Sequence, residues 1–151
     1  MQINLFISME NETYNKLVNQ LFTSTKWEKR AEAAREIGHL GEAKATNLLF
    51  RALKSEKDAV VTNNIIEAMG RIKDPKATMP IIDFLKSELE KDEPDKTRLF
   101  VIVESLMKIG DKRALTHLGL LYNSCEAEIK NFTEEALECI DPNWKKNIKN
   151  H

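Results

Sequence analysis

Turn-forming residues, cysteines and aromatic residues are all scarce in this sequence. Its 151 residues include only five glycines, four prolines and two cysteines, and aromatic residues make up 7%. So little glycine and proline disfavours a β-protein built from many tight turns. Cys125 and Cys139 form no CxxC pair, and on one helix they would lie about 21 Å apart along its axis, beyond disulfide reach. We therefore expect two reduced thiols in a cytoplasmic protein.

Long apolar runs and an excess of either charge are also missing. No stretch approaches the roughly 18 apolar residues of a membrane-spanning helix, and the opening MQINLFISMENE lacks the basic segment of a signal peptide. The 23 basic and 24 acidic residues nearly cancel, so there is no global electrostatic reason to bind nucleic acid or an acidic membrane. Apolar residues make up 42%, which is enough for one domain with a hydrophobic core.

The sequence does contain an internal repeat. Four segments align without gaps: IGHLGEAKA from Ile37, MGRIKDPKA from Met69, LMKIGDKRA from Leu106 and LECIDPNWK from Leu137. Their starts are 32, 37 and 31 residues apart, and the longest interval contains the charged insertion SELEKDEPDK. In each segment two apolar residues precede a turn. A repeat of this period is typical of stacked helical units with insertions in their loops.

Between these turns the apolar residues recur with a period near 3.6, which indicates amphipathic α-helices. Eight such stripes are present, and one of them runs from Trp27 to Ile37. We predict four antiparallel helix pairs in a single domain covering residues 1–151. The repeats are expected at about 9–40, 41–72, 73–109 and 110–141, followed by a polar tail at 142–151. In this tail Trp144 either folds back over the last pair or belongs to a frayed end.

Candidate helix caps support this division of the chain. A side-chain oxygen at the start of a helix accepts hydrogen bonds from the first free amides. For the second helix of each pair, the candidates are a capping box at Thr25–Glu28, then Asp58, Asp95 and Ser124. For the first helices of the later pairs, they are Asp74 and Asp111.

Two prolines five residues apart, Pro75 and Pro80, fit the same interpretation. A proline inside a helix costs about 3 kcal/mol, because it removes an amide donor and clashes with a preceding carbonyl. Pro75 directly follows the expected cap Asp74, and Pro80 falls in the first helical turn if the helix starts near Ala77. Amides in that turn have no intrahelical partner. Both prolines therefore mark a helix start and prevent fusion with the preceding helix.

The segment MGRIKDPKATMPIIDFL resembles the HEAT-like repeat in the short form also called the PBS-lyase HEAT-like repeat. The matching residues are Gly70, Ile72, Asp74, Pro75, Lys76, Ala77 and Pro80. Further copies lie at 107–114 and 37–45, and the resemblance covers about residues 10–142. It implies an all-α, right-handed α–α superhelix, a short armadillo-type solenoid whose second helices line the concave side. It also implies a non-enzymatic role in binding another macromolecule.

No residue pattern indicates a catalytic, cofactor or metal site. His39, His117 and His151 are not spaced as metal ligands, and the His-Glu dipeptides of HEAT-type di-iron hydroxylases are missing. Phosphate-binding glycine loops and nucleophile motifs are missing as well. One alternative function is a lyase-like or accessory factor that handles a cofactor or a modified protein. No reactive residues cluster around the two cysteines to support it.

The expected binding surface is the face of the second helices that points away from the core. The candidate partner-binding residues are Glu28, Glu32, Arg35, Asn63, Asn64, Glu67, Val101, Glu104, Lys108 and Glu135. Over all positions assigned to this face, acids outnumber bases eight to three, which favours a protein or peptide partner with a basic segment. The alternative is that glutamates occupy a solvated face because they are good helix formers.

Two features of the second helices call for an explanation. Asn63 and Asn64 are adjacent, although asparagine is a poor residue in the middle of a helix. They are expected either to hold the backbone of an extended partner, as in armadillo folds, or to make a kink or an inter-repeat hydrogen bond. Residues 99–103, LFVIV, are apolar all round, so a neighbour or a partner must cover them. This leaves open a structural subunit that docks through residues 95–109.

Overall fold

The computed structural model describes residues 2–124 and 126–148, with side chains from Met9 onward. Cys125 and His151 therefore lie outside the described residues. The α-helices are α1 (Gln2–Thr23), α2 (Trp27–Leu40), α3 (Thr46–Ser55), α4 (Ala59–Ile72), α5 (Thr78–Leu89), α6 (Lys96–Ile109), α7 (Leu115–Ser124), α8 (Ala127–Ile140) and α9 (Trp144–Ile148). Short 3₁₀ turns precede three of them: η1 (Ala43–Ala45), η2 (Pro75–Ala77) and η3 (Lys112–Ala114). No strand occurs in this part of the chain, which confirms the all-α prediction.

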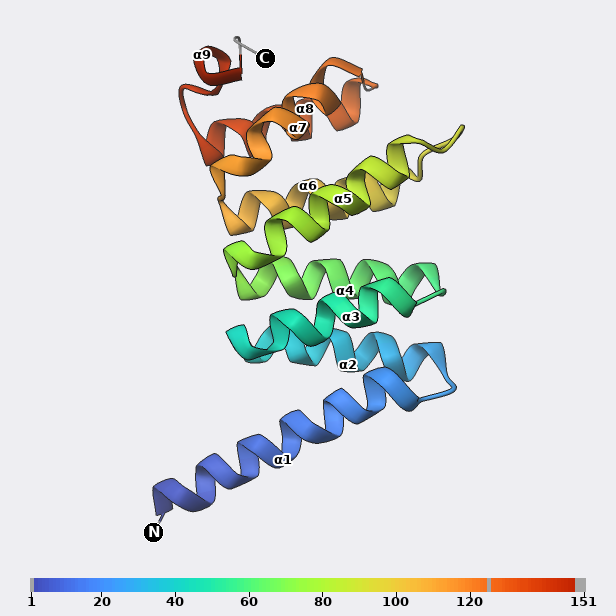
Figure 1. Cartoon of the computed structure of the whole chain (residues 1–151), viewed down its shortest axis with the longest axis vertical. Helices are drawn as coiled ribbons and strands as arrows, with labels where there is room; N and C mark the ends of the chain where they lie inside the picture. The colour runs from blue at the N-terminus through green and yellow to red at the C-terminus, as the bar shows by residue number, and fades with distance from the viewer. Residues whose placement is uncertain (1, 125, 149–151) are drawn as a thin grey trace.

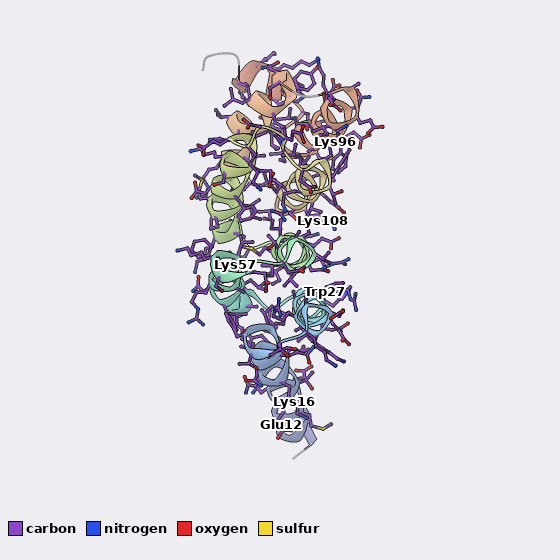
Figure 2. All side chains as sticks on the ribbon, turned by 90° about the vertical axis from the view of Figure 1, so that its right-hand side faces the viewer. Glu12, Lys16, Trp27, Lys57, Lys96 and Lys108 are labelled. Atoms are coloured by element: carbon purple, nitrogen blue, oxygen red, sulfur yellow. The ribbon has the colours of Figure 1, made fainter. Side chains whose placement is uncertain are left out.

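The helix pairs stack along one axis into a solenoid. Figure 1 shows the pairs α1–α2, α3–α4, α5–α6 and α7–α8 following one another from blue to red. In Figure 2 the first helices α3 and α5 form one column, and the second helices α2, α4 and α6 form another. Each second helix packs against the next one, whereas first helices of successive pairs make few or no direct contacts. Because the layers approach more closely on the second-helix side, we take that side as the inner face of the solenoid.

Small residues set the distance between successive second helices. A Cβ placed on Gly38 of α2 would lie 2.8 Å from the Cα of Ala68 in α4. In the next repeat, a Cβ on Gly70 of α4 would lie 2.8 Å from the Cα of Ser105 in α6. Side chains do not fit into such a gap, so glycine is required at both positions although it weakens a helix by about 0.5–1 kcal/mol. The Ser105 hydroxyl completes the second contact by donating to the carbonyl oxygen of Ile66 (3.0 Å).

A continuous hydrophobic core lies between the two columns of helices. The largest fully buried side chains are Ile37, Leu49, Ile65, Ile66, Met69, Ile81, Ile82, Leu85, Ile102, Leu106, Leu118 and Leu121. They come from α2 to α7, so each helix pair shields the apolar side chains of its neighbours, as expected for a solenoid. In the apolar segment 99–103, Leu99, Ile102 and Val103 are buried in this core. Neighbouring helices therefore provide most of the cover that this segment requires.

Two predicted caps of the second helices are confirmed. Asp58 accepts hydrogen bonds from the amides of Val60 (2.9 Å) and Val61 (3.0 Å) at the start of α4. Asp95 accepts one from the amide of Arg98 (2.9 Å) at the start of α6. These bonds satisfy amides that have no partner inside the helix, and they fix where α4 and α6 begin.

The structure also confirms that the two prolines mark a helix start. Asp74 caps η2, in which Pro75 is the first residue. Pro80 is the third residue of α5, which begins at Thr78. Both rings therefore occupy positions where no amide donor is needed.

Two other predicted caps are wrong, and so is one predicted core residue. α2 begins after Lys26, whose side chain makes no capping hydrogen bond, so Thr25 and Glu28 do not form a capping box. Ser124 is the last residue of α7, and its hydroxyl donates to carbonyls one turn earlier instead of capping α8. Trp27 belongs to the predicted buried stripe, but it is the first residue of α2 and is 43% exposed.

The C-terminal segment is folded over the last helix pair. Trp144, the first residue of α9, is only 5% exposed, and its ring lies edge-on to Tyr122 of α7 with the centroids 5.3 Å apart. Its indole Nε1–H donates to Glu138 of α8 (3.0 Å). Of the two alternatives for Trp144, the structure therefore supports the folded-back one. α9 covers part of the core that would otherwise be exposed at this end.

Asp74 and Asp111 each start their own turn, and Asp74 also connects its pair to the preceding one. Asp74 accepts hydrogen bonds from the amide of Lys76 (3.0 Å) and from the hydroxyl of Thr46 in the preceding repeat (2.8 Å). The hydrogen bond from the Lys76 amide holds the pKa of Asp74 below its usual range, and the bond from the Thr46 hydroxyl makes a smaller contribution in the same direction. The Arg113 guanidinium, followed by the Arg113 amide, lowers the pKa of Asp111 in the same way.

We predict that replacing Gly70 with alanine destabilises the solenoid. The added Cβ would collide with the backbone of Ser105, and such overpacking costs about 1–3 kcal/mol. Alanine recovers about 1 kcal/mol as the better helix former, so we expect a net loss of up to about 2 kcal/mol. Urea unfolding followed by circular dichroism measures this loss.

Gly119→Ala is the matched control for this variant. It too lies in a helix, but the three atoms nearest to its Cβ, the closest at 3.0 Å, all belong to the side chain of Ile148, which can move aside. Its free energy of unfolding should stay the same or rise slightly. Equal losses in the two variants would contradict the idea that backbone contact at Gly70 sets the helix spacing.

We also predict that the double variant Asp74→Asn with Asp111→Asn makes the protein less sensitive to acid. Both carboxyl groups have a lowered pKa in the folded state. Their stabilisation is therefore complete above the unfolded-state pKa near 4 and is lost as the pH falls through the lower folded-state pKa. The free energy of unfolding should fall less between about pH 5 and pH 2 in the double variant than in the wild type.

Candidate functional site

All ten predicted partner-binding residues lie on the second helices, and none of them is buried. Glu28, Glu32, Arg35 and Glu135 are exposed, and Asn63, Asn64, Glu67, Val101, Glu104 and Lys108 are half-buried. The four second helices α2, α4, α6 and α8 are each 14 residues long. Because they pack in sequence with their starts on the same side (Figure 1), equivalent positions of successive helices form rows across the inner face.

One such row joins four of the predicted residues. Arg35, Glu67, Glu104 and Glu135 are each the ninth residue of their helix. We call them the ninth-residue row. Three of its four members are carboxylates, and they are adjacent along the solenoid axis. The equal helix lengths that produce this row were not recognised from the sequence, although the caps at Asp58 and Asp95 already indicated two of the helix starts.

Acidic side chains dominate the middle of the inner face. The eight acids assigned to it from the sequence all reach the surface of the second helices: Glu28, Glu32, Glu36, Glu67, Glu104, Glu134, Glu135 and Glu138. Three of them have partners within the chain. Glu32 pairs with Lys29 (3.7 Å), Glu104 with Lys108 (3.0 Å), and Glu138 accepts from Trp144.

The inner face carries more basic residues than the three predicted from the sequence, which are Arg35, Lys108 and Lys130. Lys29, Arg71 and Lys96 are also exposed on second helices. Lys29 and Lys96 lie in the first turn of their helices, and Arg71 lies in the last turn. In Figure 2, Lys96 and Lys108 are seen on the column of second helices. The excess of acid is therefore confined to the central part of the face.

Asn63 takes part in a buried polar network between two repeats. Its side-chain oxygen accepts a hydrogen bond from the Arg98 Nε of α6. Arg98 is 8% exposed and pairs with Glu88 of α5 (3.4 Å), which is 2% exposed. Glu88 also accepts from the backbone amide of Asp95 (3.1 Å). Of the explanations proposed for the two asparagines, the inter-repeat hydrogen bond therefore holds for Asn63.

Asn64 makes a different kind of contact from its neighbour. Its side-chain nitrogen donates to the carbonyl of Val60 one turn earlier in α4 (2.9 Å). This bond lies within one helix, and Asn64 is half-buried beside Glu67 on the inner face. Its amide group thus remains accessible at the surface.

Apolar side chains cover part of the inner face between α6 and α8. The rings of Phe100 and Phe132 lie with their centroids 5.5 Å apart, tilted by 42°. Both rings and Val101 are half-buried and pack against the core. In the apolar segment 99–103, only Phe100 and Val101 are thus partly exposed, and Phe132 of α8 packs against Phe100.

The described residues offer little for metal or redox chemistry. No group of three or more His, Cys, Asp or Glu side chains in residues 2–124 and 126–148 is arranged to hold a metal ion. Cys139 is a free, exposed thiol on α8. Within the described helices, no segment has the length and apolar character needed to cross a membrane.

The fold defines the class of this protein, and a comparison then identifies its family. Helix pairs that each contact only their neighbours, around one continuous core, are the mark of an α-solenoid repeat protein. A family model described as HEAT repeats matches residues 14–98, more than half of the chain. The chain belongs to the HEAT repeat family, whose members generally mediate protein–protein interactions and are typically non-catalytic. A comparison with curated proteins finds no match.

We predict opposite outcomes for alanine at the two adjacent asparagines. Asn63→Ala removes a hydrogen bond to the buried Arg98 and should lower the free energy of unfolding by about 1–2 kcal/mol. Asn64→Ala removes only a bond within its own helix and inserts the better helix former, so stability should be unchanged or slightly higher. Urea unfolding of both variants provides the comparison. Equal effects would mean that the network around Arg98 does not depend on Asn63.

Proposed function

We propose that this protein is a non-enzymatic interaction module that binds a basic segment of a protein partner on the inner face of its second helices. The observation that carries the proposal is the ninth-residue row, in which Glu67, Glu104 and Glu135 come from three successive repeats. Charge-assisted hydrogen bonds to lysine or arginine are among the stronger polar contacts. A row of carboxylates also attracts a cationic partner from a distance.

The accessible groups beside this row suit an extended peptide. Asn64 lies one turn before Glu67 in α4 and has an amide group at the surface. Such a side chain can donate to and accept from the backbone of a partner. Val101, at the equivalent place in α6, offers an apolar contact. Glu28, Glu32 and Arg35 extend the same surface onto α2.

The two alternative functions receive less support from the same residues. A lyase-like factor needs reactive groups gathered at a groove. Among the described residues, the exposed thiol of Cys139 belongs to no metal-binding group of His, Cys, Asp and Glu side chains. A subunit that docks through residues 95–109 needs an apolar surface there. Leu99, Ile102 and Val103 are already buried in the core of this chain. The free thiol of Cys139 agrees with the cytoplasm as the place of action, because thiols stay reduced there.

The test of this proposal reverses charges on the inner face. We expect Glu67→Lys with Glu135→Lys to weaken the binding of a fluorescein-labelled lysine-rich peptide about tenfold, because two attractive contacts become repulsive. Fluorescence anisotropy at low salt measures the affinity, and added salt should weaken the wild-type complex.

The matched control reverses two exposed acids on first helices, Glu12→Lys on α1 and Asp83→Lys on α5. It changes the net charge of the protein by the same amount but leaves the inner face intact. If both double variants lose affinity equally, the peptide responds only to net charge, and the assignment of the inner face is wrong. Affinity purification from a native extract with the wild type and both double variants would then identify partners lost only with Glu67 and Glu135.

A further inference from the structure

A hollow lined by basic residues lies at one end of the inner face, where α2, α4 and α6 end. It has a volume of about 340 Å³ and is lined by Gly38, His39, Gly41, Arg71, Lys73 and Lys108. In Figure 1 this place corresponds to the left-hand ends of α2, α4 and α6. No carboxylate lines the hollow, whereas Arg71, Lys73 and Lys108 bring three cationic groups to it.

Gly41 leaves one side of this hollow open. A Cβ on Gly41 would meet no atom within 4 Å, so the space above it is free. Gly38 has no side chain either, and the Cδ of Arg71 would lie 3.5 Å from a Cβ at that position. The stem of Arg71 therefore lies along α2, and its guanidinium belongs to the wall of the hollow.

Two of the three cations are free to bind a ligand. Lys108 pairs with Glu104 of its own helix (3.0 Å). Among the described residues, neither Arg71 nor Lys73 forms an ion pair. Asp74, which follows Lys73, is engaged by the Lys76 amide and the Thr46 hydroxyl. Arg71 and Lys73 thus have no ion-pair partner among the described residues.

Lys73 has a backbone conformation that favours glycine. Its φ of 61° is in the left-handed region, and among the described residues it is the only non-glycine residue with a positive φ. It follows the last residue of α4, and at the same place after α2 and α6 the chain has Gly41 and Gly110, with φ of 67° and 72°. A side chain in this region strains the backbone, and residues held this way concentrate at functional sites. The fold alone would be better served by glycine, so the lysine indicates a use for its charge.

We propose that this hollow binds carboxylate groups of an acidic protein segment, with Arg71 and Lys73 as the main contacts. Arg71 offers a planar fork of donors that matches a carboxylate, and Lys73 offers a mobile point charge. A protein segment fits better than nucleic acid, because the hollow is bordered by the acidic middle of the inner face, including Glu67 one turn before Arg71. A continuous polyanion would be repelled there, whereas a peptide can present acidic and basic residues to the two regions in turn.

A simpler role for these cations is to offset the negative end of a helix dipole. His39, Arg71 and Lys108 all lie in the last turn of their helices, where positive charge is favourable. That role does not account for Lys73, which would stabilise the protein more as a glycine. The two explanations therefore differ in the effect that replacing Lys73 should have on ligand binding: the dipole explanation predicts no change in affinity, and the binding proposal predicts a loss.

The decisive variant is Lys73→Gly. We expect it to raise the free energy of unfolding while weakening the binding of a fluorescein-labelled hexaglutamate peptide about fivefold, as measured by fluorescence anisotropy at low salt. Arg71→Gln should weaken the same binding to a similar degree. Lys57→Gln, an exposed lysine at the opposite end of α4, should leave the affinity unchanged.

Three results would overturn the proposal. One is the absence of saturable binding of hexaglutamate to the wild type. Another is unchanged affinity in Lys73→Gly, which would leave the lysine without a ligand-binding role. The third is tighter binding of a labelled oligothymidylate than of hexaglutamate, with the oligonucleotide affinity lost in Lys73→Gly. The lysine-rich peptide reports separately on the inner face, so each of the two proposals can fail without the other.

Discussion

The close approach of successive second helices is the constraint on which the rest of this structure depends. Gly38 against Ala68 and Gly70 against Ser105 bring helix backbones together where no side chain could be inserted. First helices lack such contacts and remain further apart. This difference in spacing turns a stack of helix pairs into a solenoid with an inner face. It also places surface residues of different repeats next to each other.

Polar contacts between repeats then hold the stack in register. The Thr46 hydroxyl donates to Asp74 of the next repeat, and the Arg113 guanidinium donates back to the carbonyl of Pro75 (2.9 Å). Arg98 joins α6 to Asn63 of α4 inside the protein. The first two contacts end at a cap or backbone position in an adjacent pair, and the third ends at a side chain inside α4, so a shift of one residue would break each of them. The rows on the inner face are therefore as well defined as the core beneath them.

The repeat, the helix type and most helix starts could be predicted from the sequence, because they depend on local patterns. Apolar periodicity and a carboxylate before a free amide act within a few residues, and Asp58, Asp95 and Pro75 were assigned correctly for that reason. The partner of Asn63 could not be predicted, since Arg98 is 35 residues away along the chain. The left-handed backbone of Lys73 shows only in the dihedral angles, although aligning LGEA, IKDP and IGDK would have placed it opposite two glycines.

In the second helices, the positions that form the core and the helix contacts differ from the positions that carry surface charge. Core residues occupy certain places in each 14-residue second helix, and the twelfth place is glycine in α2 and α4, whereas the side chains at the ninth and thirteenth places reach the surface. These two places are one helical turn, about 6 Å, apart. On α4 they hold Glu67 and Arg71, and on α6 they hold Glu104 and Lys108. Residues of opposite charge therefore lie side by side on these two helices.

The two helices differ in whether these charges form an ion pair. In α6, Glu104 and Lys108 form one, and it stabilises the helix. In α4, Glu67 and Arg71 do not form an ion pair, and Lys73, whose backbone is strained, adds another positive charge near Arg71. Lys73 occupies the position that glycine holds after α2 and α6, so the end of α4 combines a strained backbone with an additional positive charge at the surface.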